Sequence, residues 1–114
     1  MTSQTIMTQR SIKPILLTSH EVRLNRTNML VIDVQNPKFM TCMIPGAKRL
    51  SIDVFLKDIS IHQPILITSL TGQRSFSAAQ QLIKRGYCEV YVLKGGIMAW
   101  QSAKLTVWLT KLPS

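Results

Sequence analysis

The stretch that decides the fold of this chain is PILITSLTGQRS, residues 64–75. Residues 65–68 are apolar or β-prone and predict a buried strand, after which a tight loop leads into a helix near residue 75. A strand, a short loop and a helix start in this order gather backbone N–H groups around the first loop side chain. Ser69 therefore occupies the position expected for a nucleophile. The loop residues expected to bind an anionic substrate are Leu70, Thr71, Gly72, Gln73, Arg74 and Ser75.

The identity of the side chain at residue 69 determines which chemistry the loop supports. A thiolate in this position would attack sulfur or phosphorus. The hydroxyl of Ser69 is a much weaker nucleophile unless a base removes its proton, and no base stands beside it in the sequence. A ligand-contacting hydroxyl and a helix-capping or loop-stabilising serine are both compatible with the pattern.

Short apolar runs alternate with amphipathic stretches along the rest of the chain. Strands are predicted at 15–17, 29–34, 49–51, 65–68 and 90–93. Helices are predicted at 19–26, 53–59, 75–85 and from residue 96 onward. This alternation predicts an α/β fold with a parallel sheet covered on both faces. Ligands of such sheets bind beyond the carboxyl ends of the strands, so Asp33, which closes one strand, is a supporting candidate beside Ser69.

The composition is that of one globular domain. The chain has 114 residues, 46% of them hydrophobic and 17% charged. Lysine and arginine number 14 against 5 acidic residues, which gives a net charge of +9 and favours anionic partners. Nucleic acid stays an alternative, although the cations are scattered and not interleaved with aromatics.

Cysteine and histidine do not form a metal pattern. Cys42 and Cys88 lack partners at ligand spacing, and His20 and His62 are isolated, so we expect no metal and no cofactor. Reduced thiols indicate a cytoplasmic protein, and no apolar run is long enough to cross a membrane. Cys42 is either a packed thiol or a displaced sulfur carrier near the site.

The expected organisation is a flexible N-terminus over 1–11, one domain over 12–104 and a C-terminal tail over 105–114. The tail carries Trp108 and Leu109, which either dock on the domain or form an exposed patch for a partner.

Three blocks of the chain resemble the rhodanese homology domain, the thiosulfate sulfurtransferase family. They are LVIDV at 30–34 with Phe39 and IPGA at 44–47, then residues 64–75, and then VYVLKGGI at 90–97 with Trp100. The resemblance implies a five-stranded parallel sheet flanked by helices. It also implies a loop whose first residue is a cysteine, which takes sulfane sulfur from thiosulfate or another donor and passes it to a thiophilic acceptor.

This chain departs from the family pattern at four positions. Ser69 replaces the cysteine, and a hydroxyl cannot form a persulfide. Gln35 replaces an arginine, Met43 replaces a histidine, and Leu70 stands where many sulfurtransferases carry a basic residue. Arg74 is kept, and it either pairs with a bound anion or ties the loop to an aspartate (Asp33 or Asp53) or to a carbonyl group.

Two functional hypotheses follow from the resemblance and its departures. The first is a catalytically inactive module whose loop still cradles an anion, with a small anionic ligand or a sulfur-donor or sulfur-acceptor protein as partner. The alternative is an active sulfurtransferase whose cysteine was changed to Ser69 for crystallisation.

Overall fold

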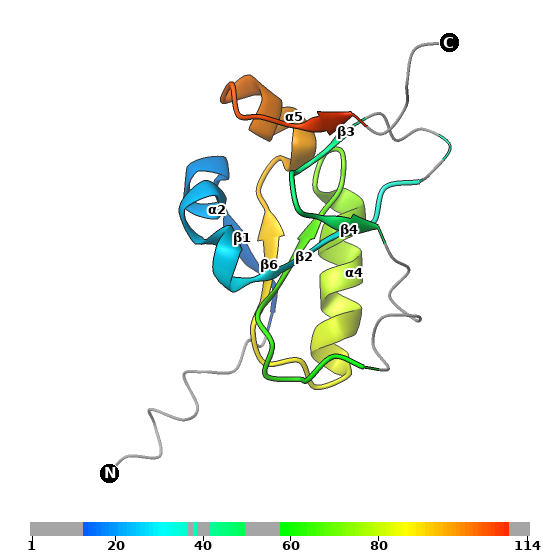
Figure 1. Ribbon diagram of the computed structural model, residues 1–114. Helices are drawn as coiled ribbons and strands as arrows, with labels where there is room; N and C mark the ends of the chain where they lie inside the picture. The colour runs from blue at the N-terminus through cyan, green and yellow to red at the C-terminus, as the bar shows by residue number, and fades with distance from the viewer. Residues whose placement is uncertain (1–12, 37, 39–41, 50–57, 110–114) are drawn as a thin grey trace.

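The computed structural model describes residues 13–36, 38, 42–49 and 58–109 (Figure 1). A five-stranded parallel sheet in the order β1-β6-β5-β2-β4 runs through the centre of this part of the chain. Its strands are β1 (Ile15–Leu17), β2 (Leu30–Asp33), β4 (Lys48–Arg49), β5 (Ile65–Thr68) and β6 (Val90–Leu93). The fold is therefore the α/β fold with a five-stranded parallel sheet that the sequence predicts.

Helices cover both faces of the sheet. One face packs against α4 (Gln73–Lys84), and the other packs against α2 (Ser19–Asn25), which continues into the 3₁₀ turn η1 (Arg26–Asn28), and against α5 (Gly96–Ser102). In β5 the side chains alternate between the two layers: Ile67 packs with the α4 layer and Leu66 with the opposite layer, which includes Trp100. Every residue of β5 is buried, which is typical of a central parallel strand.

A second, two-stranded sheet pairs β3 (Cys42–Met43) with β7 (Trp108–Leu109) in antiparallel orientation. The sequence did not predict these strands, because two-residue strands carry too few side chains to show a period. The pairing holds the segment that follows α5 against the domain, and Leu105 and Val107 pack on the core. The described residues of the 105–114 tail thus form part of the folded domain.

The other elements lie close to their predicted positions. Thr18 caps α2 in a reciprocal capping box with Glu21, and α4 begins at Gln73, two residues before the predicted helix start. The weak strand expected near 49–51 is β4, one residue earlier. The predictions for residues 1–11, for Phe39 and for most of the helix over 53–59 lie outside the described residues. Among the described helices, none has the length and apolar character needed to cross a membrane.

The N-terminus of α5 lies directly on the loop that follows β5. The amide of Ile97 donates to the carbonyl of Ser69 (2.9 Å), and the amide of Met98 donates to the carbonyl of Leu70 (3.1 Å). Gly96 has a φ of +66°. A Cβ atom there would lie against the carbonyl oxygens of Ser69 and Leu70, 2.5 Å from that of Ser69. Glycine at this position is therefore required for α5 to approach the loop.

We expect Gly96→Ala to lower the free energy of unfolding by about 3 kcal/mol or more, because the new methyl group adds a backbone clash to the cost of a left-handed conformation. Gly86→Ala is the matched control: Gly86 has a φ of +100° but open space around it, so only the conformational cost of about 1–2 kcal/mol applies. Urea denaturation of both variants measures the difference. Equal losses would mean that α5 does not press on the loop.

Candidate functional site

The candidate site is the loop between β5 and α4 together with the adjoining end of β2. Asp33 pairs in register with Thr68, so the strand ends that carry Asp33 and Ser69 are neighbours. This is the edge of the sheet where parallel α/β folds bind their ligands. The structure therefore brings together the residues that the sequence singled out at both strand ends.

The hydroxyl of Ser69 is fully engaged inside the loop. Its oxygen accepts hydrogen bonds from the amides of Gly72 and Ser75, both at 3.2 Å. It lies 3.0 Å from the hydroxyl of Ser75, which donates to the carbonyl of Gly72 at 2.9 Å. With that donor committed to Gly72, the Ser69 hydroxyl is the donor in the bond to Ser75. Ser69 is 1% exposed and Ser75 is fully buried.

These hydrogen bonds identify the Ser69 hydroxyl as the acceptor that fixes the conformation of the loop. A serine hydroxyl has one proton to donate and two lone pairs to accept with, and all three are used here. Activation as a nucleophile requires a base within hydrogen-bond reach of the oxygen. Every described partner of this hydroxyl is an amide or another hydroxyl, so none of them is a general base.

The remaining loop residues face outward. Leu70, Thr71, Gln73 and Arg74 are exposed. Gly72 precedes α4 with a φ of +101° and turns the chain into the helix. The four exposed residues have backbone amides with no acceptor among the described residues. Two of these amides, those of Gln73 and Arg74, lie in the first turn of α4, where the helix dipole favours negative charge.

Arg74 has a structural contact. Its Nε donates to the carbonyl of Val34 at 3.0 Å and ties the start of α4 to the end of β2. The predicted alternative of a bond to Asp33 is wrong, because the carboxylate of Asp33 is occupied by other donors; Asp53 lies outside the described residues. The bond to Val34 uses one edge of the guanidinium group, which is exposed.

Asp33 is the buried acid of the site. One of its carboxylate oxygens accepts from the backbone amide of Gln35 at 2.9 Å. The other accepts from the side-chain amide of Gln35 at 2.9 Å and from the hydroxyl of Thr68 at 3.1 Å. Burial raises the pKa of Asp33 above its ordinary value, although these bonds and the charge of Arg49 oppose the rise.

Gln35 and Thr68 are the functional positions whose roles sequence reasoning missed. Gln35 was singled out only as a departure from the family, yet its side-chain amide also donates to the carbonyl of Cys42 at 2.9 Å and so links β2 to β3. The sequence indicates Thr68 only as the last residue of a strand. The available signal was the polar side chain of Thr68 directly before the loop, since Thr68 lies in register with Asp33 at the neighbouring strand end.

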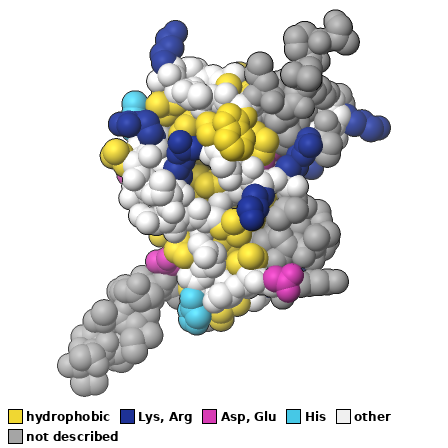
Figure 2. Space-filling view, in the orientation of Figure 1, with side chains coloured by type: hydrophobic (Ala, Val, Ile, Leu, Met, Phe, Trp, Pro, Cys, Tyr) yellow, Lys and Arg dark blue, Asp and Glu magenta, His cyan; other side chains and the backbone are white. Residues whose placement is uncertain are grey.

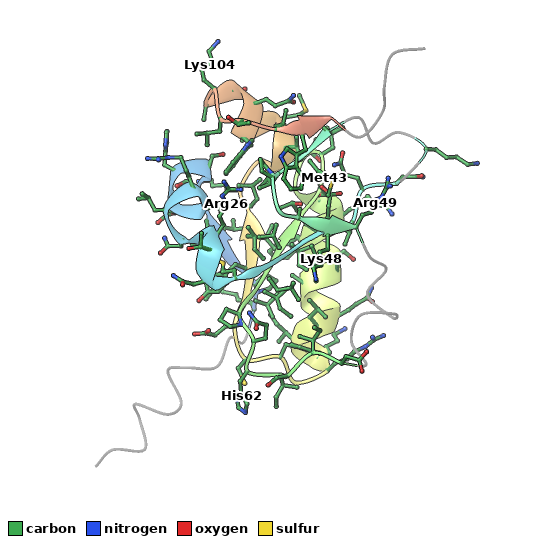
Figure 3. The ribbon with its side chains drawn as sticks, in the orientation of Figure 1. Arg26, Met43, Lys48, Arg49, His62 and Lys104 are labelled. Carbon is green, nitrogen blue, oxygen red and sulfur yellow. The ribbon has the colours of Figure 1, made fainter. Side chains whose placement is uncertain are left out.

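The two cysteines lie in different environments. Cys42 is buried in β3 among core residues, which agrees with a packed thiol. Cys88 is half-buried before β6, with its Sγ 3.9 Å from Nδ1 of the exposed His62, at the opposite end of the sheet from the loop (Figure 3). Across the described ranges, no group of three potential metal ligands occurs.

A shallow cavity of about 380 Å³ adjoins the outer side of the loop. Its walls include the loop residues Thr71 and Gln73, the aromatic ring of Phe76 on α4, and Leu16 on β1. Lys94, which follows β6, supplies a cationic side chain at its border. The cavity therefore combines an apolar wall with an ammonium group and the exposed part of the loop.

These features define an α/β protein whose candidate site is a strand-to-helix loop at the carboxyl edge of a parallel sheet. The model of the rhodanese-like domain matches residues 17–103. The chain is 32% identical over 84 residues to a protein named thiosulfate sulfurtransferase GlpE from Pseudoalteromonas translucida, covering 70% of this chain and 80% of that protein. A second protein of the same name, from Stutzerimonas stutzeri, is 32% identical over 76 residues, covering 63% of this chain and 70% of that protein. The chain belongs to the rhodanese-like family.

Solved structures show the same fold. The solution structure of the rhodanese-like domain from the Anabaena protein Alr3790 has a TM-score of 0.76 at 17% identity, covering 90% of this chain and 86% of that one. The Thermoplasma volcanium rhodanese-related protein has a TM-score of 0.70 at 18% identity, covering 82% of this chain and 97% of that one.

The raised pKa of Asp33 predicts a pH dependence of stability. A folded-state pKa above the unfolded value means that the folded chain holds the proton more tightly. The resulting stabilisation is complete below the unfolded pKa, near 3.8, and is lost as the pH rises through the folded value. Asp33→Asn cannot titrate, but it breaks the network with Gln35, at a cost of about 1–3 kcal/mol.

We therefore expect the stability advantage of the wild type over Asp33→Asn to shrink as the pH rises from about 4 toward neutrality. Denaturant titrations across this range measure the difference. An advantage that stays constant or grows with pH would contradict a raised pKa at Asp33.

Proposed function

We propose that this rhodanese-like domain is catalytically inactive as a sulfurtransferase and serves as a binding module whose β5–α4 loop takes an anionic group. That group belongs to a small ligand or to a partner protein that donates or accepts sulfur. The observation that carries the proposal is the state of Ser69, whose hydroxyl is buried and uses its proton and both lone pairs within the loop.

The chemistry of the hydroxyl supports the inactive part of the proposal. Sulfur transfer requires a nucleophile that can hold the sulfane sulfur, and an oxygen cannot form the persulfide that a thiolate forms. Oxygen nucleophiles also need a base, which the bonding partners of Ser69 do not supply. Catalysis by this loop would require an activated hydroxyl, and no described partner of Ser69 activates it.

The exposed part of the loop supports the binding part. The amides of Gln73 and Arg74 begin a 12-residue helix and have no acceptor among the described residues, which suits a negatively charged group. Lys94 at the border of the adjoining cavity adds positive charge, and Phe76 adds apolar surface. A ligand with an anionic end and an apolar body fits this combination best.

The alternative is an active sulfurtransferase that is represented here with serine in place of its cysteine. The curated relatives named thiosulfate sulfurtransferase favour it. The surroundings of the loop favour natural divergence instead, because Gln35 bonds both Asp33 and Cys42, and Met43 is buried in the core. Gln35 and Met43 thus both have structural contacts. A single engineered change at residue 69 would not account for these two further differences from the family pattern. The natural coding sequence at residue 69 distinguishes the two cases.

We expect the wild-type chain to form no thiocyanate from thiosulfate and cyanide above the uncatalysed rate. In the same preparation, phosphate should shift the NMR signals of the Gln73 and Arg74 amides in a saturable way, because these donors are available to an anion. Ser69→Cys restores a sulfur nucleophile to the loop. We expect its thiolate to take the sulfane sulfur of thiosulfate, with sulfite as the leaving group, so that the mass of the variant increases by one sulfur atom.

The control for this experiment is Ser69→Ala, which removes the hydroxyl and adds no nucleophile. Thiocyanate production by the wild type above the level of Ser69→Ala would overturn the inactive assignment. Phosphate-induced shifts that do not saturate, or that spread evenly over the chain, would overturn the binding assignment.

A further inference from the structure

The face formed by the small β3–β7 sheet carries an exposed tryptophan within a group of cationic side chains. Trp108 is 52% exposed and pairs across the strands with Met43, which is buried. Directly paired residues project on the same side of a sheet, so Trp108 and Met43 lie on one side of the β3–β7 sheet. We call this surface, with its four cations, the Trp108 face. The cations are Arg26, Lys48, Arg49 and Lys104.

In Figure 3 the labels of Arg26, Lys48 and Arg49 lie around Met43, and Lys104 lies farther off, beside α5 at the edge of the molecule. In Figure 2 the region of Met43 shows a hydrophobic patch flanked by Lys and Arg side chains. Two contacts hold Arg26 in place. Its guanidinium group donates a hydrogen bond to the carbonyl of Pro45, and its Cζ lies 5.9 Å from the centroid of the Trp100 ring. Lys48 and Arg49 form β4 and lie three and four residues after Pro45 in the chain.

Few carboxylates of the described residues are visible on this side of the molecule (Figure 2). Asp33, the carboxylate nearest to Arg49 in the sheet register, is fully buried. In Figure 2 the acidic side chains that are plainly visible lie mainly in the lower half, away from the hydrophobic patch. The described side chains of the Trp108 face therefore carry more positive than negative charge, and an acidic surface complements such a charge.

The arrangement favours a polypeptide over a nucleic acid. Protein interfaces have an apolar centre with aromatic anchors and a charged rim, as the Trp108 face has. Single-stranded nucleic acids instead bind along a groove with several aromatic platforms for successive bases. Trp108 is the one aromatic among the large exposed hydrophobic residues of the described ranges.

We propose that the Trp108 face docks an acidic segment of a partner protein, with an apolar side chain of that segment against Trp108 and its carboxylates against the cationic rim. This interaction goes beyond the anion-binding loop, since it uses side chains that line neither the loop nor its cavity. Arg26 and Trp100 keep the rim ordered before the partner arrives, which reduces the entropy lost on docking.

The test uses the full chain and a synthetic peptide of glutamate and aspartate with two leucines at its centre. We expect saturable binding by titration calorimetry or fluorescence, weakened about tenfold by Trp108→Ala, because a buried aromatic anchor carries a large share of interface energy. Lys48→Glu should weaken binding several-fold. Lys84→Glu, an equal change in net charge at the far end of α4, should leave it within about twofold.

Several outcomes would overturn the proposal. They are the absence of binding, equal losses for Lys48→Glu and Lys84→Glu, and full affinity in Trp108→Ala. A fourth is tighter binding of a thymidine oligonucleotide of matched charge with the same variant pattern, which would assign the face to nucleic acid. Lys48 is exposed on an edge strand, so its variant still decides the result if Trp108→Ala perturbs β7. A preserved phosphate response of the loop amides in these variants separates failure of the face from failure of the loop.

Discussion

Two backbone amides of the β5–α4 loop donate to one hydroxyl oxygen, that of Ser69, and the geometry of the site depends on this contact. The amides belong to Gly72 and Ser75, three and six residues further on, so a single acceptor fixes the whole turn from strand to helix. Because the oxygen is buried, no water replaces it as an acceptor, and each amide left without a partner would cost about 1–3 kcal/mol. The same contact uses the atom that an enzyme of this fold would need for chemistry.

At the neighbouring strand end, the carboxylate of Asp33 is likewise occupied by structural hydrogen bonds. Asp33 is buried, and its carboxylate is bonded by the neutral side chains of Gln35 and Thr68. A buried carboxylate without a tightly bound cation favours its protonated form, which is why its pKa rises. Gln35 in turn bonds the carbonyl of Cys42 and joins the main sheet to the small sheet that carries Trp108. The buried polar groups of the site are therefore hydrogen-bonded to one another, and its exposed groups, such as Gln73 and Arg74, lie at its surface.

Most of the fold could be predicted from the sequence, because its central strands are continuous apolar runs and the helix that becomes α4 has a clear period. The helix end near residue 85 and the helix start at residue 96 could also be predicted, and glycines (Gly86, Gly95 and Gly96) stand at both places. The pairing of β3 with β7 was not, because it joins residues more than sixty positions apart through two-residue strands. Neither strand has enough residues for a pattern.

The candidate site was predicted in outline, and its internal bonding was not. The position of Ser69 after a buried strand indicated a loop rich in amides, and that arrangement is present. The sequence could not tell that the amides of Gly72 and Ser75 turn inward to Ser69 while those of Gln73 and Arg74 stay available. It also left Arg74 with three alternatives, and only the three-dimensional register showed the carbonyl of Val34 as its partner.

The central claim is that the Ser69 hydroxyl holds the loop, and amide hydrogen exchange in Ser69→Ala tests it most directly. Loss of the acceptor should speed exchange at Gly72 and Ser75 and lower the free energy of unfolding by about 1–3 kcal/mol. Thr71→Ala, which truncates an exposed neighbour in the same loop, should leave both amides protected. Unchanged exchange at Gly72 and Ser75 in Ser69→Ala would contradict the claim and return Ser69 to the role of an available nucleophile.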